Sequence, residues 1–144
     1  MLLGSNIDPE NNLRSALDHL DNVVRKSRIW KTKAFGSNGP DFLNMAVELQ
    51  TNLNRNDFKK EIINDIEKKL ERVRTKDKYA PRTIDIDIMI VNDAVIDNDI
   101  WQKAFASIPV SELRPNILGP NNQKLALIAE KLKSSANAEL FSSI

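Results

Sequence analysis

Apolar residues recur with helical spacing in three parts of the chain. A stripe at intervals of three and four residues predicts a helix over residues 9–25. A second stripe follows Asn54 and Asn56, either of which can cap a helix, and predicts a helix that ends near Arg74. A third predicts a helix over residues 123–132, after which the last ten or so residues look frayed.

Alternation of apolar and polar residues predicts strands between these helices. A short apolar run at 1–3 indicates a first strand, and the segments 27–33, 42–53 and 83–91 alternate with a period of two. The resulting order, βαββαβ, is that of the α+β ferredoxin-like fold, an antiparallel sheet with helices packed on one face. Residues 98–122 contain three prolines and too little periodicity for an assignment.

Composition narrows the class of protein. The 144 residues fit a single domain over residues 1–144, and 21 Lys+Arg against 20 Asp+Glu give a net charge of +1, too weak a field to suggest nucleic acid. The chain has no cysteine, which excludes disulfides and thiolate metal sites and fits a cytoplasmic location. No apolar stretch reaches the length of a membrane span, and the first ten residues show no export signal.

Two carboxylates share one face of the segment 83–91. Strand alternation places Asp85 and Asp87 opposite the isoleucines, with Cα atoms about 7 Å apart. Such a pair on a rigid strand suits Mg²⁺, which binds one or two carboxylates together with water and substrate phosphates. The alternative is an ordinary strand with one solvated face.

Basic residues precede this acidic strand closely. Arg72, Arg74, Lys76, Lys78 and Arg82 lie within eleven positions. Guanidinium groups bind phosphate oxygens in bidentate fashion, so this cluster beside a carboxylate pair favours a polyphosphate site. The alternative is a helix end whose dipole is complemented by a solvated basic loop. The chain contains neither a Walker-type phosphate loop nor a Gly-x-Gly-x-x-Gly motif.

Four segments together resemble a known family. They are Leu3-Gly4-Ser5-Asn6, Phe42-Leu43-Asn44-Met45-Ala46-Val47, Ile66-Glu67 followed by Arg72-Val73-Arg74, and Ala80-Pro81-Arg82-Thr83-Ile84-Asp85-Ile86-Asp87-Ile88. In this order they resemble the 6-hydroxymethyl-7,8-dihydropterin pyrophosphokinase family of folate biosynthesis. The resemblance implies a ferredoxin-like fold and transfer of diphosphate from ATP to the hydroxymethyl group of the dihydropterin, with two Mg²⁺ ions and release of AMP. It also implies small-molecule substrates and a monomer that binds neither nucleic acid nor membrane.

The resemblance assigns roles to individual residues. Those implied in catalysis are Arg72, Arg82, Asp85 and Asp87, the two aspartates being the metal ligands. Those implied on the ATP side are Glu67, Arg74, Lys78, Tyr79 and Lys103. Those implied to bind the pterin are Thr32, Gly36, Phe42, Asn44 and Phe105, of which Phe105 and Asn44 would stack on the ring and bind its polar edge.

The second half departs from the family pattern. Lys103 stands where the family has an arginine, and no histidine follows His19, although the family carries a Pro-His pair that contacts ATP. These changes favour a slow or specialised kinase, and the alternative is a non-catalytic or altered-specificity paralogue that binds pterin or nucleotide. An RNA-binding module is poorly supported, because the strands lack a pair of ring-stacking aromatics in the expected context.

Overall fold

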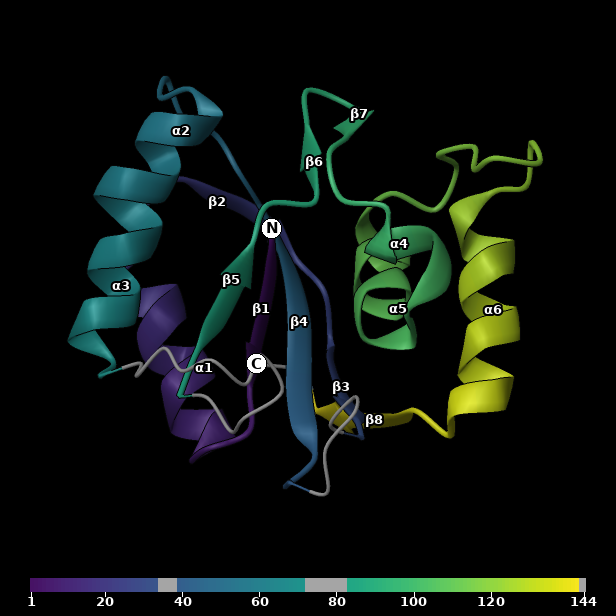
Figure 1. Ribbon diagram of the computed structural model, residues 1–144, viewed down its shortest axis with the longest axis horizontal. Coiled ribbons are helices and arrows are strands. Elements are labelled where there is room, and N and C mark those ends of the chain that lie inside the picture. The colour runs from purple at the N-terminus through teal and green to yellow at the C-terminus, as the bar shows by residue number, and fades with distance from the viewer. Residues whose placement is uncertain (34–38, 72–82, 143–144) are drawn as a thin grey trace.

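The computed structural model describes residues 1–33, 39–71 and 83–142. Its main sheet has six strands and the order β5–β1–β4–β3–β8, with β2 also pairing β4, and every pair in it is antiparallel. The strands are β1 (Leu2–Ser5), β2 (Val23–Lys26), β3 (Ile29–Thr32), β4 (Phe42–Leu49), β5 (Asp85–Asp87) and β8 (Glu139–Ser142) (Figure 1). A separate hairpin joins β6 (Ile90–Val91) to β7 (Ala94–Val95).

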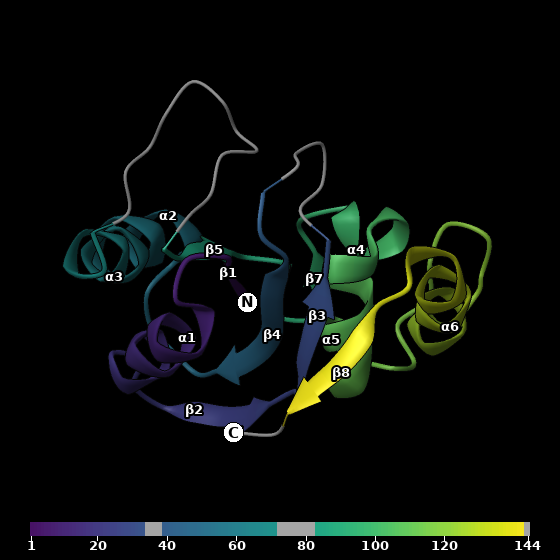
Figure 2. The ribbon, with the colours of Figure 1, turned by 90° about the horizontal axis from the view of Figure 1, so that it is seen from below.

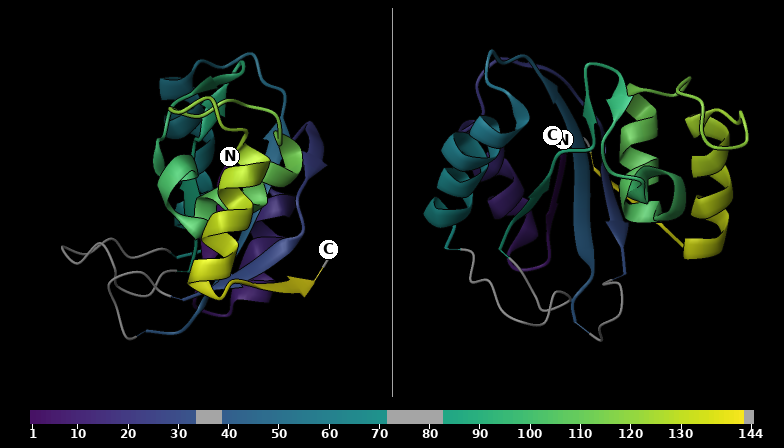
Figure 3. Two further views of the ribbon diagram at one scale, coloured as in Figure 1. Left: turned by 90° about the vertical axis from the view of Figure 1, so that its right-hand side faces the viewer. Right: turned by 45° about the horizontal axis from the view of Figure 1, so that its top comes forward.

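Helices cover both faces of this sheet (Figures 1 and 3). On one side lie α1 (Pro9–Asp18) and a continuous helical segment made of α2 (Arg55–Phe58), the π-helical η1 (Lys59–Ile63) and α3 (Asn64–Lys69). On the other side α5 (Ala104–Leu113) packs on β4 and β3, and α4 (Asp99–Gln102) and α6 (Leu125–Ala136) pack against α5. The ferredoxin-like order expected from the sequence is confirmed. The sequence predicts helices on one face of the sheet, and the structure adds a second layer of helices on the other face.

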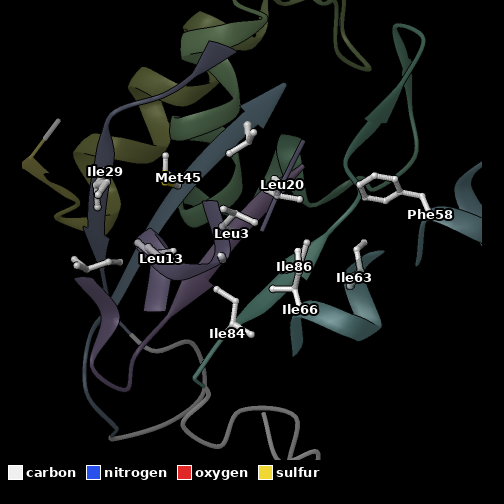
Figure 4. Close-up of a cluster of buried hydrophobic side chains, with 13 residues drawn as sticks. Leu3, Leu13, Leu20, Ile29, Met45, Phe58, Ile63, Ile66, Ile84 and Ile86 are labelled. Carbon is white, nitrogen blue, oxygen red and sulfur yellow. The ribbon is translucent and has the colours of Figure 1, made fainter. Parts of the chain in front are cut away.

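Alternate strand residues build the core under α1 and α3. Leu3, Met45, Ile84 and Ile86 point to this side and are almost completely buried. Figure 4 shows them meeting side chains from the helices, and the helical contributors labelled there include Leu13, Ile63 and Ile66. The period-two pattern of the sequence therefore identified the residues of this core correctly.

The intervening strand residues face α5. Leu2 and Ala46 are buried there together with Ile100, Ala106 and Val110. The face that the alternation predicted to be polar is thus a second core, in which Leu2 and Ala46 pack against α5. The candidates Asn44 and Asp85 lie on this same face of the sheet.

Two of the three predicted helices were too long at their C-terminal ends, whereas the third, expected over 123–132, is α6 and continues to Ala136. The helix expected over 9–25 ends at Asp18, and Val24 belongs to β2, where it is 50% exposed. Asn22 has a positive φ of 59°, which breaks the helix before the β-branched pair that follows. The second helix ends at Lys69 rather than near Arg74, because Glu71 also has a positive φ, 58°.

The predicted strands need three corrections. The strand expected over 42–53 ends at Leu49, and that over 83–91 is broken between Asp87 and Ile90. The break follows from the turn of the chain into the β6–β7 hairpin, where Met89 O accepts from Ile96 N at 2.8 Å. The last ten or so residues were expected to be frayed, whereas Glu139–Ser142 form β8, which pairs with the outer edge of β3.

Candidate active site

Candidate residues from neighbouring strands form a row across the sheet. The register pairs Asp85 with Gly4, Gly4 with Asn44 and Asn44 with Trp30. All four lie on the face that α5 covers, because their chain neighbours Leu3, Met45 and Ile84 point to the opposite core. The row lies where β1 and β3 end and β4 and β5 begin, so it occupies one end of the sheet.

Asp85 and Asp87 project from β5 on this same face and are half-buried. Their strand positions, two residues apart, place the Cα atoms about 7 Å from each other. Within the described ranges no group of three or more His, Cys, Asp or Glu side chains gathers as a metal cluster. Two carboxylates on adjacent same-face positions of a strand are nevertheless a donor set that Mg²⁺ accepts when water and phosphate oxygens complete its coordination.

Asn44 is held in one orientation by its neighbours. It is 3% exposed, and its Nδ2 donates to Oγ1 of Thr32, itself buried, at 2.8 Å. On the other side, a Cβ atom added at Gly4 would lie 2.9 Å from Oδ1 of Asn44. The amide keeps one further N–H donor and an acceptor oxygen, which are the groups needed to bind the polar edge of a heterocycle.

The role of Gly4 was not predicted, although the sequence held a signal for it. A glycine inside a strand often marks a place where another group approaches the backbone closely. Here the close group is the Asn44 side chain, and Cδ1 of Phe42 lies 3.6 Å from the same point. Gly4, Phe42 and Asn44 therefore form one packed unit.

The start of α5 brings two more candidate residues. Phe105 lies in its first turn and is half-buried against the core that contains Ala46 and Met89. Lys103 lies directly before the helix, with extended backbone between α4 and α5, and is also half-buried. The structure thus adds an aromatic ring and a cation to the α5 side of the sheet.

Glu67 is the described candidate that lies apart from the others. It belongs to α3, on the other side of the sheet, and is 5% exposed. The remaining candidates, Gly36, Arg72, Arg74, Lys78, Tyr79 and Arg82, lie outside the described residues. Their assignments stay predictions.

A cavity of about 440 Å³ lies at the opposite end of the sheet, and its lining includes Glu48, Arg55, Met89 and Arg114. None of the described candidate residues lines it. Its lining includes two carboxylates, those of Glu48 and Asp93. The hydrogen bond from Arg25 lowers the pKa of Glu48, attraction from Arg114 adds to this, and burial opposes it. The cavity and the candidate site are separate places.

Comparison with known proteins identifies the family. Residues 1–115 match the model of the 7,8-dihydro-6-hydroxymethylpterin-pyrophosphokinase family. The chain is 34% identical to 2-amino-4-hydroxy-6-hydroxymethyldihydropteridine pyrophosphokinase of Bacillus subtilis over 126 residues, which cover 77% of this chain and 74% of the relative. It is 29% identical to proteins of the same name from Synechocystis sp. (85% of this chain, 69% of the relative) and Aquifex aeolicus (85% and 83%). The chain therefore belongs to the 7,8-dihydro-6-hydroxymethylpterin-pyrophosphokinase family.

Proposed function

We propose that this protein transfers diphosphate from ATP to the hydroxymethyl group of 6-hydroxymethyl-7,8-dihydropterin in folate biosynthesis. The hydroxyl oxygen of the pterin forms a bond to the β-phosphorus, and the bond from that phosphorus to the oxygen shared with the α-phosphate breaks. The products are AMP and the pterin diphosphate, and the hydroxyl proton is released.

One observation carries this proposal within the site. Asp85, Gly4 and Asn44 are neighbours on three adjacent strands, so a carboxylate and an oriented amide lie on one face about two strand spacings, or roughly 10 Å, apart. A substrate that carries its reacting group at one end and a hydrogen-bonding ring at the other suits this separation. Family membership supplies the identity of the ring.

We assign the pterin to the space bounded by Asn44, Thr32, Phe42 and Phe105. Asn44 would bind the ring's polar edge through the donor and acceptor that Thr32 leaves available. The two phenylalanines would stack on the ring faces, an arrangement that contributes about 0.5–1.5 kcal/mol beyond burial for each aromatic pair. Gly36 would complete this binding site.

We assign the phosphates to the side of Asp85 and Asp87. These carboxylates would hold Mg²⁺, and two ions are expected. When bound, the metal would neutralise phosphate oxygens and orient the diphosphate. Lys103 would contact the phosphates as a single point charge, since an ammonium cannot make the bidentate contact of an arginine. Arg72, Arg74, Lys78, Tyr79 and Arg82 would complete the ATP side, and Glu67, which is 5% exposed in α3, would support it from the other side of the sheet rather than touch ATP.

We further propose that the enzyme acts as a monomer in the cytoplasm. One chain supplies every candidate residue, and the absence of cysteine fits a reducing compartment. In the part of the chain that the structure describes, no helix has both the length and the apolar character needed to cross a bilayer.

The decisive experiment is incubation of the protein with ATP, Mg²⁺ and 6-hydroxymethyl-7,8-dihydropterin, followed by chromatographic separation of the nucleotides and pterins. We expect AMP and the pterin diphosphate in equal amounts. Formation of ADP would contradict diphosphate transfer, because it means that only the γ-phosphoryl group has moved.

The metal assignment is tested with Asp85→Asn and Asp87→Asn, which keep the size of each side chain. We expect each change to reduce the turnover by about 100-fold or more, because a metal ligand is lost. The melting temperature should stay equal or rise, since repulsion between the carboxylates is relieved. Asp65→Asn, which breaks an exposed ion pair of 2.9 Å with Lys69, is the matched control and should leave the turnover unchanged. Turnover at the normal rate in both site variants would refute the assignment.

A further inference from the structure

The carboxylate of Glu112, near the C-terminal end of α5, is bound by Arg28, which lies between β2 and β3 and directly precedes β3. The backbone N of Arg28 donates to Oε1 of Glu112 at 2.8 Å, and its Nε donates to Oε2 at 2.8 Å. The Nη2 atom of Arg28 lies 2.6 Å from the same Oε2. Both carboxylate oxygens are therefore engaged, which fixes direction as well as distance.

A second set of contacts holds the same end of the helix. Arg25 donates through Nη2 to the Leu113 carbonyl at 3.0 Å and to Oε1 of Glu48 at 2.8 Å. Arg114 reaches Oε1 of Glu48 at 2.9 Å and Oδ1 of Asp93 at 3.3 Å. Carbonyl groups at a helix C-terminus lack partners within the helix and carry negative partial charge, so a cation is well placed there.

The middle of α5 is held by packing. Ile108 is buried against Trp30 of β3 and Ala129 of α6. Glu112 binds Arg28, just before β3 begins, and Ile108 packs on Trp30 within β3. The helix therefore runs alongside β3 with its C-terminal end beside the start of the strand (Figure 2). From Glu112 to Phe105 the helix spans seven residues, or about 10 Å, and from Arg28 to Thr32 the extended chain spans four residues, or about 13 Å. Phe105 consequently lies near the level of Thr32, the residue that orients Asn44.

We propose that the contact between Arg28 and Glu112 fixes the position of α5 along β3. It thereby fixes the position of Phe105 beside the proposed pterin-binding site. Apolar packing alone resists separation of helix and sheet better than it resists sliding, because it is not directional. The two-oxygen contact to Glu112 is directional and opposes sliding. The inference rests on the proposed function, because it takes the pterin to be the ligand beside Phe105.

The test uses Glu112→Gln in the full chain. The amide keeps the shape of the side chain and one acceptor for Arg28 N, and it loses the charge-assisted contact. We expect the pterin Kd, measured by calorimetry with Mg²⁺ and a non-hydrolysable ATP analogue, to rise by about three- to tenfold. The pterin KM should rise with it, while kcat at saturating pterin stays within about twofold.

Two further variants test whether a lower pterin affinity comes from the lost contact or from a general loss of stability. Arg28→Gln keeps the backbone donor, removes the guanidinium and should weaken pterin binding in the same way. Glu130→Gln changes a carboxylate of α6 whose ion pair with Lys133, at 4.0 Å, lies within that helix, and it should leave pterin binding unchanged. A loss of pterin affinity in all three variants would overturn the proposal.

A double substitution separates this inference from the proposed function. If Glu112 acts through Phe105, Glu112→Gln should cause no additional loss of pterin affinity in a Phe105→Ala background. An equal loss in both backgrounds, or none in either, overturns the positioning role. If Phe105→Ala itself leaves the pterin Kd unchanged, the placement of the pterin in the proposed function is wrong instead.

Discussion

At the scale of single residues, the site depends on the absence of a side chain at Gly4. The Asn44 amide fills the space that a Cβ atom would need, and Thr32 holds its other side. Both partners are buried, so a displaced amide would lose a hydrogen bond without gaining water. The orientation of Asn44 is therefore set by its two neighbours.

We expect Gly4→Ala to displace Asn44 and weaken pterin binding by about tenfold, because the added Cβ would stand 2.9 Å from Oδ1. Calorimetric titration with the pterin and an ATP analogue measures this. Affinity for the ATP analogue alone should not change. Full pterin affinity in Gly4→Ala would show that the orientation of Asn44 does not matter for binding.

Thr32→Val tests the other neighbour of Asn44. Valine keeps the branched shape and removes the hydroxyl that accepts from Asn44 Nδ2. We expect pterin affinity to fall and the melting temperature to drop by a few degrees, since a buried amide donor loses its partner. The same fall in pterin affinity for Thr32→Ser, which retains a hydroxyl, would contradict this explanation.

Sequence alone could predict which face Asp85 and Asp87 share, because strand alternation decides it locally. It could not predict that Gly4 stands between Asp85 and Asn44. That neighbourhood depends on the register of three strands distant in sequence. Register follows from burial on both faces, and the second face is not visible in the local pattern.

At the scale of elements, α5 shows why periodicity can fail. Residues 106–110 are all buried, because the helix lies between the sheet and α6. A helix covered on several sides has no polar stripe and gives no period of 3.6 residues. Pro109 within it adds a misleading signal for a turn. The sequence therefore left this element unassigned.

The second helical segment shows a related effect. The π-helical turn Lys59–Ile63 adds a residue between buried positions, so Phe58 is followed by Ile63, five positions later. Spacing of three and four residues from Phe58 predicts that Ile62 is buried in the apolar stripe, whereas Ile62 is only partly buried. Constant 3.6-residue spacing was the wrong assumption at this point.

A third element, β8, leads to a stability prediction. It covers the outer edge of β3 through pairs that include Trp30 with Leu140 and Lys31 with Glu139. Truncation after Asn137 removes these pairs, and we expect the free energy of unfolding to fall by roughly 1–3 kcal/mol and aggregation to increase. Urea unfolding measures the first effect and light scattering the second.

Truncation after Ser142 is the matched control, because it keeps every residue of β8. Its unfolding midpoint should equal that of the full chain. If the longer truncation also leaves the midpoint unchanged, β8 contributes nothing to the stability of the sheet edge.

At the scale of the whole molecule, the fold brings site residues together by closing a second layer over the sheet. The order of strands and helices in the first two thirds was predictable apart from β2 and the β6–β7 hairpin, because each of the other elements carries its own pattern. The helix predicted over 123–132 is α6. The layer that it forms with α4 and α5 was not predicted, since α4 and α5 are defined by packing on Leu2, Ala46 and each other. That layer carries Lys103 and Phe105, which the resemblance had already named as candidates, so only their placement on the α5 side of the sheet required the structure.

The junction between this layer and the sheet makes stability depend on pH. Glu48 binds Arg25 and Arg114, and its folded pKa lies below its ordinary value of 4.5. A carboxylate with a lowered pKa in the folded state contributes stability that is fully present above its unfolded pKa. This contribution is lost as the pH falls through the folded pKa, that is, below about 4.5.

We therefore expect Glu48→Gln to lower the melting temperature at pH 7 and to make less difference as the pH falls below about 4.5. The magnitude at pH 7 should be about 1 kcal/mol or less, because the carboxylate and both arginines are partly exposed. Thermal unfolding of both proteins across pH 3–7 measures the difference, and raising the salt concentration should reduce it. A difference of the same size at every pH would mean that Glu48 stabilises the junction by its shape rather than by its charge.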